Sequence, residues 1–139
     1  MTDAPLRHEV RIEAPLEIVH RFFTDPLRLV QWWPSEAEID PRPRGALRLR
    51  FARPDGGTTL ARGEFIELSP RRIVFSWGFE GDPDLAPGGS RVEVTLAPDG
   101  TGTLVRLEHH GLPAMQRGPH DQGWALFLGR LREVASLRP

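Results

Sequence analysis

The sequence contains no cysteine and no lysine. Without cysteine the chain has no disulfide framework, no thiolate zinc site and no thiol nucleophile. The basic residues are all arginine, 18 of them against 19 acidic residues, and the net charge is −1. A chain with this balance lacks the basic footprint of a nucleic-acid-binding protein, so we expect no nucleic-acid partner.

Long apolar runs are also missing. No run approaches the length of a membrane span, and the first residues lack the basic and apolar regions of a signal peptide. We therefore expect a cytoplasmic protein with no membrane insertion. A chain of 139 residues fits one domain, residues 1–139, which can bury about two thirds of its unfolded surface.

The C-terminal stretch, residues 120–137, has a clear helical pattern. Gly118 and Pro119 are typical of a helix start, so we expect the helix to begin near residue 119. Gly129 lowers its intrinsic stability by about 1 kcal/mol relative to alanine, so the helix needs a partner surface. Its apolar stripe follows the spacing of one helix face and consists of Trp124, Phe127, Leu128, Leu131, Val134 and Ala135.

Alternating polar and apolar residues predict strands in most of the remaining chain. A first strand covers residues 6–13, and Pro15 and Pro26 then begin two short helices. Turns at residues 54–57, 69–70 and 98–100 separate a run of five or six antiparallel strands. A long sheet of this kind curls as it twists, and one helix closing it leaves room between the two.

Seven short motifs occur along the chain. They are Phe22-Phe23-Thr24-Asp25-Pro26, Gln31-Trp32-Trp33-Pro34, Pro54-Asp55-Gly56, Gly63-Glu64-Phe65 with Ser69-Pro70, Ile73-Val74-Phe75-Ser76-Trp77, His109-His110-Gly111-Leu112 and Gly123-Trp124. In this order and spacing they resemble the SRPBCC superfamily, specifically its branch related to the activator of Hsp90 ATPase. The resemblance implies an α+β helix-grip (START-like, Bet v 1-like) fold. In that fold a curved antiparallel sheet of about seven strands wraps around a long C-terminal helix, with two short helices after the first strand.

The resemblance leaves the function open. Members of the superfamily bind lipids, hormones or polyketides, some cyclise or hydrolyse them, and the Hsp90 activators are co-chaperones; the fold does not choose among these roles. Our leading hypothesis is binding of a small, largely hydrophobic organic molecule in a cavity between the sheet and the C-terminal helix. The alternatives are a protein-interaction module of the Hsp90 co-chaperone kind and an enzyme of the polyketide cyclase kind. No cofactor and no metal is predicted.

Aromatic side chains on inward faces are the candidates for lining such a cavity, although core packing would also explain them. We expect it to open between Trp32-Trp33 and the loop at residues 81–89, a candidate lid. The predicted ligand-binding residues are Trp32, Trp33, Phe51, Phe65, Phe75, Trp77, His109, Trp124 and Phe127.

Two histidines have a separate interpretation. Alternation places His109 on the inward face and His110 outward, so these neighbours cannot chelate one metal. His8 also faces inward, and the resemblance places its strand antiparallel beside the last strand. His8 and His109 could bind a metal with a carboxylate such as Glu64, act as acid and base, or form a hydrogen-bonded structural pair. The sequence has no phosphate loop, nucleophile elbow or paired-carboxylate motif, so we predict no catalytic residue.

Overall fold

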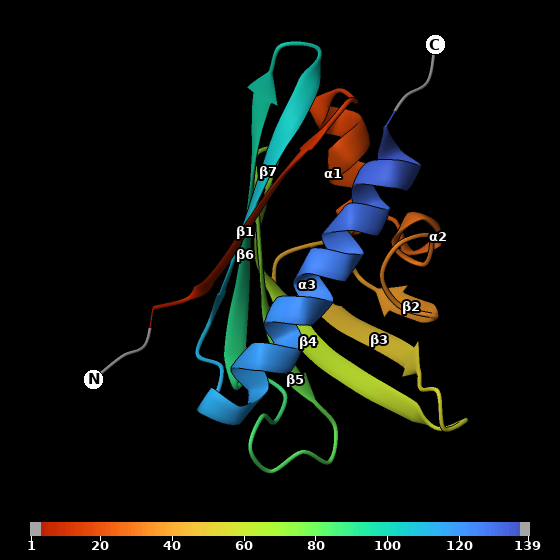
Figure 1. Cartoon of the computed structure of the whole chain (residues 1–139), viewed down its shortest axis with the longest axis vertical. Coiled ribbons are helices and arrows are strands. Elements are labelled where there is room, and N and C mark those ends of the chain that lie inside the picture. Colours follow the sequence, from red (N-terminus) through yellow and green to blue (C-terminus); the bar gives the residue numbers. More distant parts are fainter. Residues whose placement is uncertain (1–3, 137–139) are drawn as a thin grey trace.

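The computed structural model describes residues 4–136. The elements are β1 (Leu6–Ile12), α1 (Leu16–Thr24), α2 (Pro26–Leu29), β2 (Glu36–Ile39), β3 (Ala46–Ala52), β4 (Thr58–Ser69), β5 (Arg72–Phe79), β6 (Ser90–Asp99), β7 (Gly102–His110) and α3 (Ala114–Ala135). The strands form one antiparallel sheet in the order β1-β7-β6-β5-β4-β3-β2. α3 lies across its concave side, with α1 and α2 beside the C-terminal half of α3 (Figure 1). The predicted α+β helix-grip fold is confirmed.

A bulge in β4 contributes to the curvature of the sheet. The pairing of β4 with β5 shifts register between Phe65 and Glu67, so Ile66 is an extra residue and is exposed. Bulges of this kind bend the strand and increase its twist. In Figure 1, β3 and β4 turn away from the direction of β6 and β7 and pass around α3.

α3 begins five residues earlier than the sequence predicts. Its first residue is Ala114, and Pro119 lies inside the helix, so the predicted start near residue 119 is wrong. The proline ring fixes φ at a value that a helix accepts and removes only one backbone donor, whose partner would be the carbonyl of Met115. Met115 is 90% exposed, so water can satisfy that carbonyl.

Most of the predicted apolar stripe of α3 is buried. Trp124, Leu128, Leu131 and Ala135 lie in the core, whereas Val134 is 43% exposed and its predicted burial is wrong. At about 100° per residue Val134 lies about 80° from Trp124, at the edge of the stripe. α3 ends at Ala135, and residue 137, the predicted end, lies outside the described residues. Within residues 4–136, no helix has both the length and the apolar character needed to cross a membrane.

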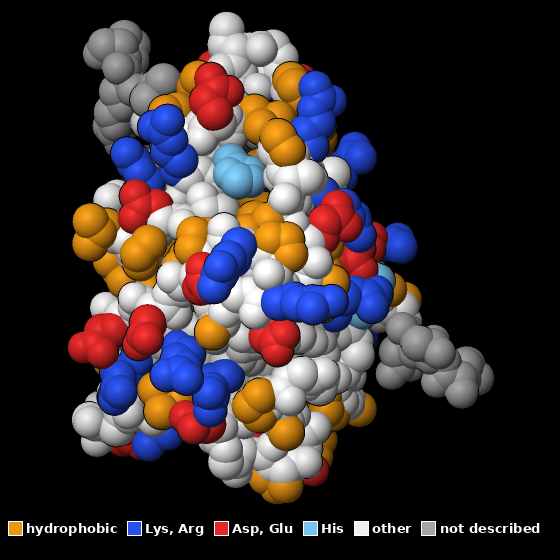
Figure 2. Space-filling view, turned by 180° about the vertical axis from the view of Figure 1, so that it is seen from behind, with side chains coloured by type: hydrophobic (Ala, Val, Ile, Leu, Met, Phe, Trp, Pro, Cys, Tyr) orange, Lys and Arg blue, Asp and Glu red, His pale blue; other side chains and the backbone are white. Residues whose placement is uncertain are grey.

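The side of the sheet that faces away from α3 carries interleaved charges. Arg7 pairs with Glu108 at 3.0 Å and Arg106 with Glu9 at 2.8 Å, which couples β1 to β7. Figure 2 likewise shows arginine and carboxylate side chains mixed across one face of the molecule, with hydrophobic side chains scattered among them. Exposed ion pairs of this kind contribute little stability each, so the fold depends on the core beneath α3.

Candidate ligand-binding cavity

A cavity of about 290 Å³ lies between α3 and the concave side of the sheet. Aromatic rings make up most of its wall, and none of its described lining residues is a carboxylate or a guanidinium. Apolar walls with a few polar groups are typical of small-molecule sites, and the volume is at the lower end of their usual range. The lining residues are Trp33, Phe51, Thr59, Trp77, Phe79, Gln116, Pro119, His120, Gly123, Trp124 and Phe127.

Strand alternation and helical spacing place the lining side chains on surfaces that face each other. On the sheet, alternation turns Trp77 and Phe79 of β5 towards the helix. On α3, helical spacing places Gln116, His120 and Gly123 on one side. Gly123 has no side chain, and a Cβ added there would lie 3.9 Å from the ring of Phe127, at ordinary contact distance. The glycine therefore leaves space at the cavity that a larger residue would fill.

Trp33 is the centre of the aromatic wall. Its ring stacks on Trp77 at a centroid distance of 5.2 Å and contacts Trp124 at 5.1 Å. Its ring also stacks on that of Trp32, the preceding residue, at a centroid distance of 5.4 Å. The indole N–H of Trp32 donates to the carbonyl of Phe22 at 2.9 Å, so Trp32 is anchored in the core and supports Trp33 from behind. The wall is thus held in place before any ligand arrives.

The structure divides the nine predicted ligand-binding residues into two groups. Five line the cavity, namely Trp33, Phe51, Trp77, Trp124 and Phe127. Four do not: Trp32, Phe65, Phe75 and His109 are buried outside the lining. Alternation shows which face a residue takes, but not how deeply it lies along the strand, so it could not separate the two groups. Ligand binding by any of them stays a prediction.

His109 is fully occupied by hydrogen bonds within the protein. Its Nδ1 accepts from the indole N–H of Trp124 at 3.0 Å, so the proton of the neutral ring is on Nε2, which donates to Ser90 Oγ at 2.9 Å. The Ser90 hydroxyl donates in turn to the carbonyl of Trp77 at 2.9 Å. Burial, followed by the nearby His120 and His110, lowers the pKa of His109 to about 3. His109 is therefore a neutral structural residue and cannot orient a ligand without losing a bond.

The predicted placement of His8 and His109 is confirmed, but they do not form a pair. β1 lies beside β7 with Leu6 opposite His109, so His8 and His109 share the inner face. His8 Nε2 contacts Asp121 of α3 at 2.9 Å instead. Glu64 is exposed on β4, and β5 and β6 lie between β4 and β7. The hypothesis of a metal site formed by these histidines and Glu64 is wrong.

His120 is one of three polar cavity residues that sequence reasoning missed, together with Thr59 and Gln116. Its Nδ1–H donates to the Gln116 carbonyl at 2.9 Å, so Nε2 carries the lone pair and accepts from the indole N–H of Trp77 at 3.2 Å. Burial lowers the pKa of His120, opposed by the bond to Gln116. The helical spacing of His120, Gly123 and Phe127 was available within the predicted helix. Gln116 was concealed, because Pro119 was interpreted as the helix start.

The loop between β5 and β6, the predicted lid, contributes no residue to the cavity lining. Asp82 organises this loop, because its Oδ1 accepts from the backbone N–H of Asp84 at 2.9 Å and of Leu85 at 3.2 Å. Its Oδ2 accepts from the Gln116 side chain at 3.2 Å. The loop therefore ties the first turn of α3 to the sheet, and Leu85 is buried. The lid role stays a prediction.

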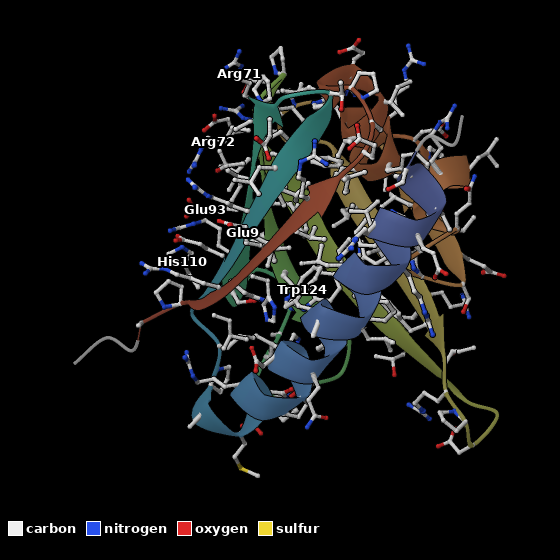
Figure 3. The ribbon with its side chains drawn as sticks, turned by 45° about the horizontal axis from the view of Figure 1, so that its top comes forward. Glu9, Arg71, Arg72, Glu93, His110 and Trp124 are labelled. Atoms are coloured by element: carbon white, nitrogen blue, oxygen red, sulfur yellow. The ribbon has the colours of Figure 1, made fainter. Side chains whose placement is uncertain are left out.

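A cluster of one histidine and two carboxylates lies on the opposite side of the sheet. Figure 3 shows Trp124 between α3 and the sheet, with Glu93 and His110 on the other side. His110 Nε2 lies 3.3 Å from Glu93 and 3.1 Å from Glu108, and these three groups could offer a metal three ligand atoms within 4.8 Å of one another. Arg72 already contacts Glu93 at 2.6 Å. We therefore assign the cluster to the ion-pair network of the outer face.

A groove of about 380 Å³ crosses β2, β3 and β4, but its lining is charged. Arg50 contacts Glu36 at 3.1 Å and Arg62 contacts Glu80 at 3.2 Å. These groups neutralise one another at the protein surface and need no ligand. The aromatic cavity under α3 remains the stronger candidate for a binding site.

Comparisons with known proteins agree with the fold. The structure of protein CV1439 from Chromobacterium violaceum superimposes with a TM-score of 0.84 at 27% identity, over 97% of this chain and 99% of that one. An AHSA1-like protein from Rhizobium etli is 39% identical, with a TM-score of 0.71 over 99% of this chain and 88% of its own. DynU16, a protein in the dynemicin biosynthetic locus, is 27% identical, with a TM-score of 0.77 over 94% of this chain and 46% of its own.

Among curated proteins, none matches this sequence. Residues 13–136 match the family model described as Activator of Hsp90 ATPase homolog 1-like protein. That range extends from the end of β1 to the end of α3, and it contains every cavity-lining residue. The chain belongs to the family of activator of Hsp90 ATPase homolog 1-like proteins.

Proposed function

We propose that this protein binds a small, uncharged, largely hydrophobic organic molecule in the cavity between α3 and the sheet. The observation that carries the proposal is a cavity of about 290 Å³ whose wall is built from aromatic rings and contains no ionised side chain among the described lining residues. Burial of apolar ligand surface would supply the affinity, at about 25 cal/mol per Å² before the entropy losses of binding are subtracted.

The composition of the wall limits the class of ligand. An anionic group would lose its hydration with no arginine in the described lining to replace it. A long acyl chain would exceed a volume at the lower end of small-molecule pockets. We therefore propose a compact, ring-containing ligand. The similarity to DynU16, a protein in a biosynthetic locus, is consistent with a small-molecule ligand.

Tryptophan fluorescence tests the proposal. Trp33, Trp77 and Trp124 line the cavity, so an uncharged quencher such as 1-nitronaphthalene should reduce the emission saturably as it binds. Phe127→Ala should weaken this binding because it removes one wall of the cavity. Leu126→Ala is the matched control: Leu126 is the preceding residue of α3, 54% exposed, and lies outside the lining.

The result that contradicts the proposal is quenching that is linear in quencher concentration and equal in the two variants, as collisions with surface groups would produce. The anionic analogue 2-naphthalenesulfonate provides a second comparison. It should bind more weakly than the neutral probe, because the cavity offers no charged partner among the described lining residues.

The family description favours one alternative, a protein-interaction role of the co-chaperone kind. Exposed apolar side chains exist for such a contact, including Leu27 at 76% and Met115 at 90% exposure, but they stand on different elements, α2 and the first turn of α3. If the quencher shows no saturable binding while a pull-down recovers one stoichiometric protein partner, the interaction role replaces the ligand-binding proposal.

An enzymatic role of the polyketide cyclase kind has less support. The residue we considered for it, His109, has both ring nitrogens engaged and lies outside the cavity lining. His120 lines the cavity, but its Nδ1 donates to a backbone carbonyl and the described lining has no carboxylate to act with it. A general acid or base needs hydrogen-bond reach of the reacting group and a suitable pKa.

A further inference from the structure

Two tryptophan–histidine hydrogen bonds lie near the cavity, and they differ in accessibility. The bond from Trp124 to His109 is 3.0 Å long, and His109 is fully buried outside the lining. The bond from Trp77 to His120 is 3.2 Å long and joins two residues that both line the cavity. A length of 3.2 Å is at the upper limit for an N–H donor, so the second bond is the weaker of the two by geometry.

The polarity of the Trp77–His120 bond is fixed. An indole nitrogen can only donate, and His120 Nε2 can only accept while Nδ1 donates to the Gln116 carbonyl. Burial lowers the pKa of His120, so the ring is neutral near pH 7 and the lone pair on Nε2 is retained. The cavity wall thus presents one donor and one acceptor side by side, in a surface that is otherwise mostly aromatic.

We propose that Trp77 and His120 select a ligand with a hydroxyl group on an aromatic ring, a proposal that rests on the ligand-binding function above. A hydroxyl is a donor and an acceptor at once, so a single oxygen can donate to His120 Nε2 and accept from Trp77 Nε1. Insertion of this oxygen requires the half-buried His120 ring to turn away from Trp77. The inserted hydroxyl replaces one weak bond by two, while the ligand ring contacts the aromatic wall.

Other functional groups fit this pair less well. An ether or carbonyl oxygen would satisfy Trp77 and leave His120 Nε2 without a donor. An ammonium group would satisfy His120 and leave the Trp77 N–H unpaired. Leaving a buried polar group unpaired is more costly than the gain from a typical hydrogen bond. The arrangement therefore discriminates by hydrogen-bond complementarity, on top of the apolar burial that any ring-containing ligand would gain.

Equilibrium dialysis of three matched probes tests the proposal: naphthalene, 2-methoxynaphthalene and 2-naphthol. Wild-type protein should bind 2-naphthol about three- to tenfold more tightly than the other two, the factor expected for a net gain of one hydrogen bond. His120→Phe keeps a ring but removes the acceptor. Both oxygen-containing probes can then only accept from Trp77, so the preference for 2-naphthol over 2-methoxynaphthalene should be lost while naphthalene binding persists. His120→Gln, which keeps an acceptor, should retain part of it.

Trp77→Phe provides an independent arm if His120→Phe does not fold, as judged by circular dichroism. It removes the donor and leaves His120 Nε2 free to accept, so 2-naphthol should still bind more tightly than 2-methoxynaphthalene, which has no proton to donate. If wild-type protein binds all three probes with equal affinity, if His120→Phe keeps the preference over 2-methoxynaphthalene, or if Trp77→Phe loses it, the hydroxyl selection is wrong while the ligand-binding function stands. If none of the three probes binds, the ligand-binding function itself is contradicted.

Discussion

Burial determines the chemistry of the two inner histidines. His109 lies in the core with both nitrogens bonded, and His120 lies at the cavity wall with its lone pair directed to Trp77. In both, burial disfavours the imidazolium form and lowers the pKa. Neither would carry a charge near pH 7, which keeps the cavity wall neutral and suited to an uncharged ligand.

The stability of the protein should therefore depend on pH through His109. Its pKa is about 3 in the folded chain against 6.5 for an exposed histidine, so between these values the unfolded chain binds a proton that the folded chain does not. The free energy of unfolding should fall as the pH is lowered through this interval, by at most about 1.4 kcal/mol per pH unit from this residue. Urea unfolding at several pH values measures the slope.

The matched variant for this test is His109→Gln, which keeps an amide donor and acceptor but does not titrate. It should show a flatter dependence of stability on pH than the wild type. Some slope remains, because the pKa of His120 is lowered in the same direction. Parallel curves for the two proteins would show that His109 is protonated in the folded state and that the account of its hydrogen bonds is incorrect.

At the scale of elements, α3 is held by its buried stripe. Leu131 has no exposed surface and lies at the centre of the stripe, so Leu131→Ala should lower the free energy of unfolding by about 2 to 5 kcal/mol through lost burial and the cavity left behind. Val134→Ala, on the same helix but 43% exposed, should change it by less than about 0.5 kcal/mol. Urea unfolding of both variants checks this. Similar losses of unfolding free energy in the two variants would contradict the assignment of Leu131 to the core and Val134 to the edge of the stripe.

Gly129 provides an opposite prediction for α3. Among residues 4–136, no atom lies within 4 Å of a Cβ added there, so Gly129→Ala should stabilise the protein by about 1 kcal/mol through helix propensity alone. Gly78 is the contrasting site, because a Cβ there would lie 1.9 Å from the carbonyl oxygen of Ala86, and Gly78→Ala should destabilise the protein. Thermal unfolding ranks the two variants against the wild type. A melting temperature of Gly129→Ala below that of the wild type would contradict the helix geometry.

The sequence allowed the elements to be predicted better than their details. Alternation and turn residues were sufficient to predict the sheet, because every second side chain of a strand points to the same face. The start of α3 was missed because proline is favoured in a first turn and disfavoured in a helix interior, where it loses a hydrogen bond and clashes with the carbonyl four residues earlier. Pro119 nevertheless lies inside α3. The bulge shifts the phase of the alternation, so that Phe65 and Leu68 both pack against the core. It was missed because Ile66 is itself apolar and obscures this shift in the sequence.

At the scale of the whole molecule, the cavity depends on residues distant in the sequence. Trp33 follows α2, Trp77 lies on β5 and His120 on α3, and they meet only because the bent sheet wraps around the helix. Trp33 and Trp77 were predicted from local sequence patterns. Such patterns do not show which polar side chain from a distant part of the chain would lie beside them. The cavity wall is thus a property of the fold, whereas its aromatic content could be read from the sequence.

The most direct test of the central claim uses the indole N–H signals of the four tryptophans in a two-dimensional ¹H–¹⁵N spectrum, assigned by Trp→Phe variants. As 2-naphthol is added, the signals of Trp33, Trp77 and Trp124 should shift saturably, because these side chains line the cavity. The signal of Trp32, whose N–H is bonded to the Phe22 carbonyl in the core, should move least. Shifts that do not saturate, or that are confined to residues outside the cavity lining, would contradict ligand binding between α3 and the sheet.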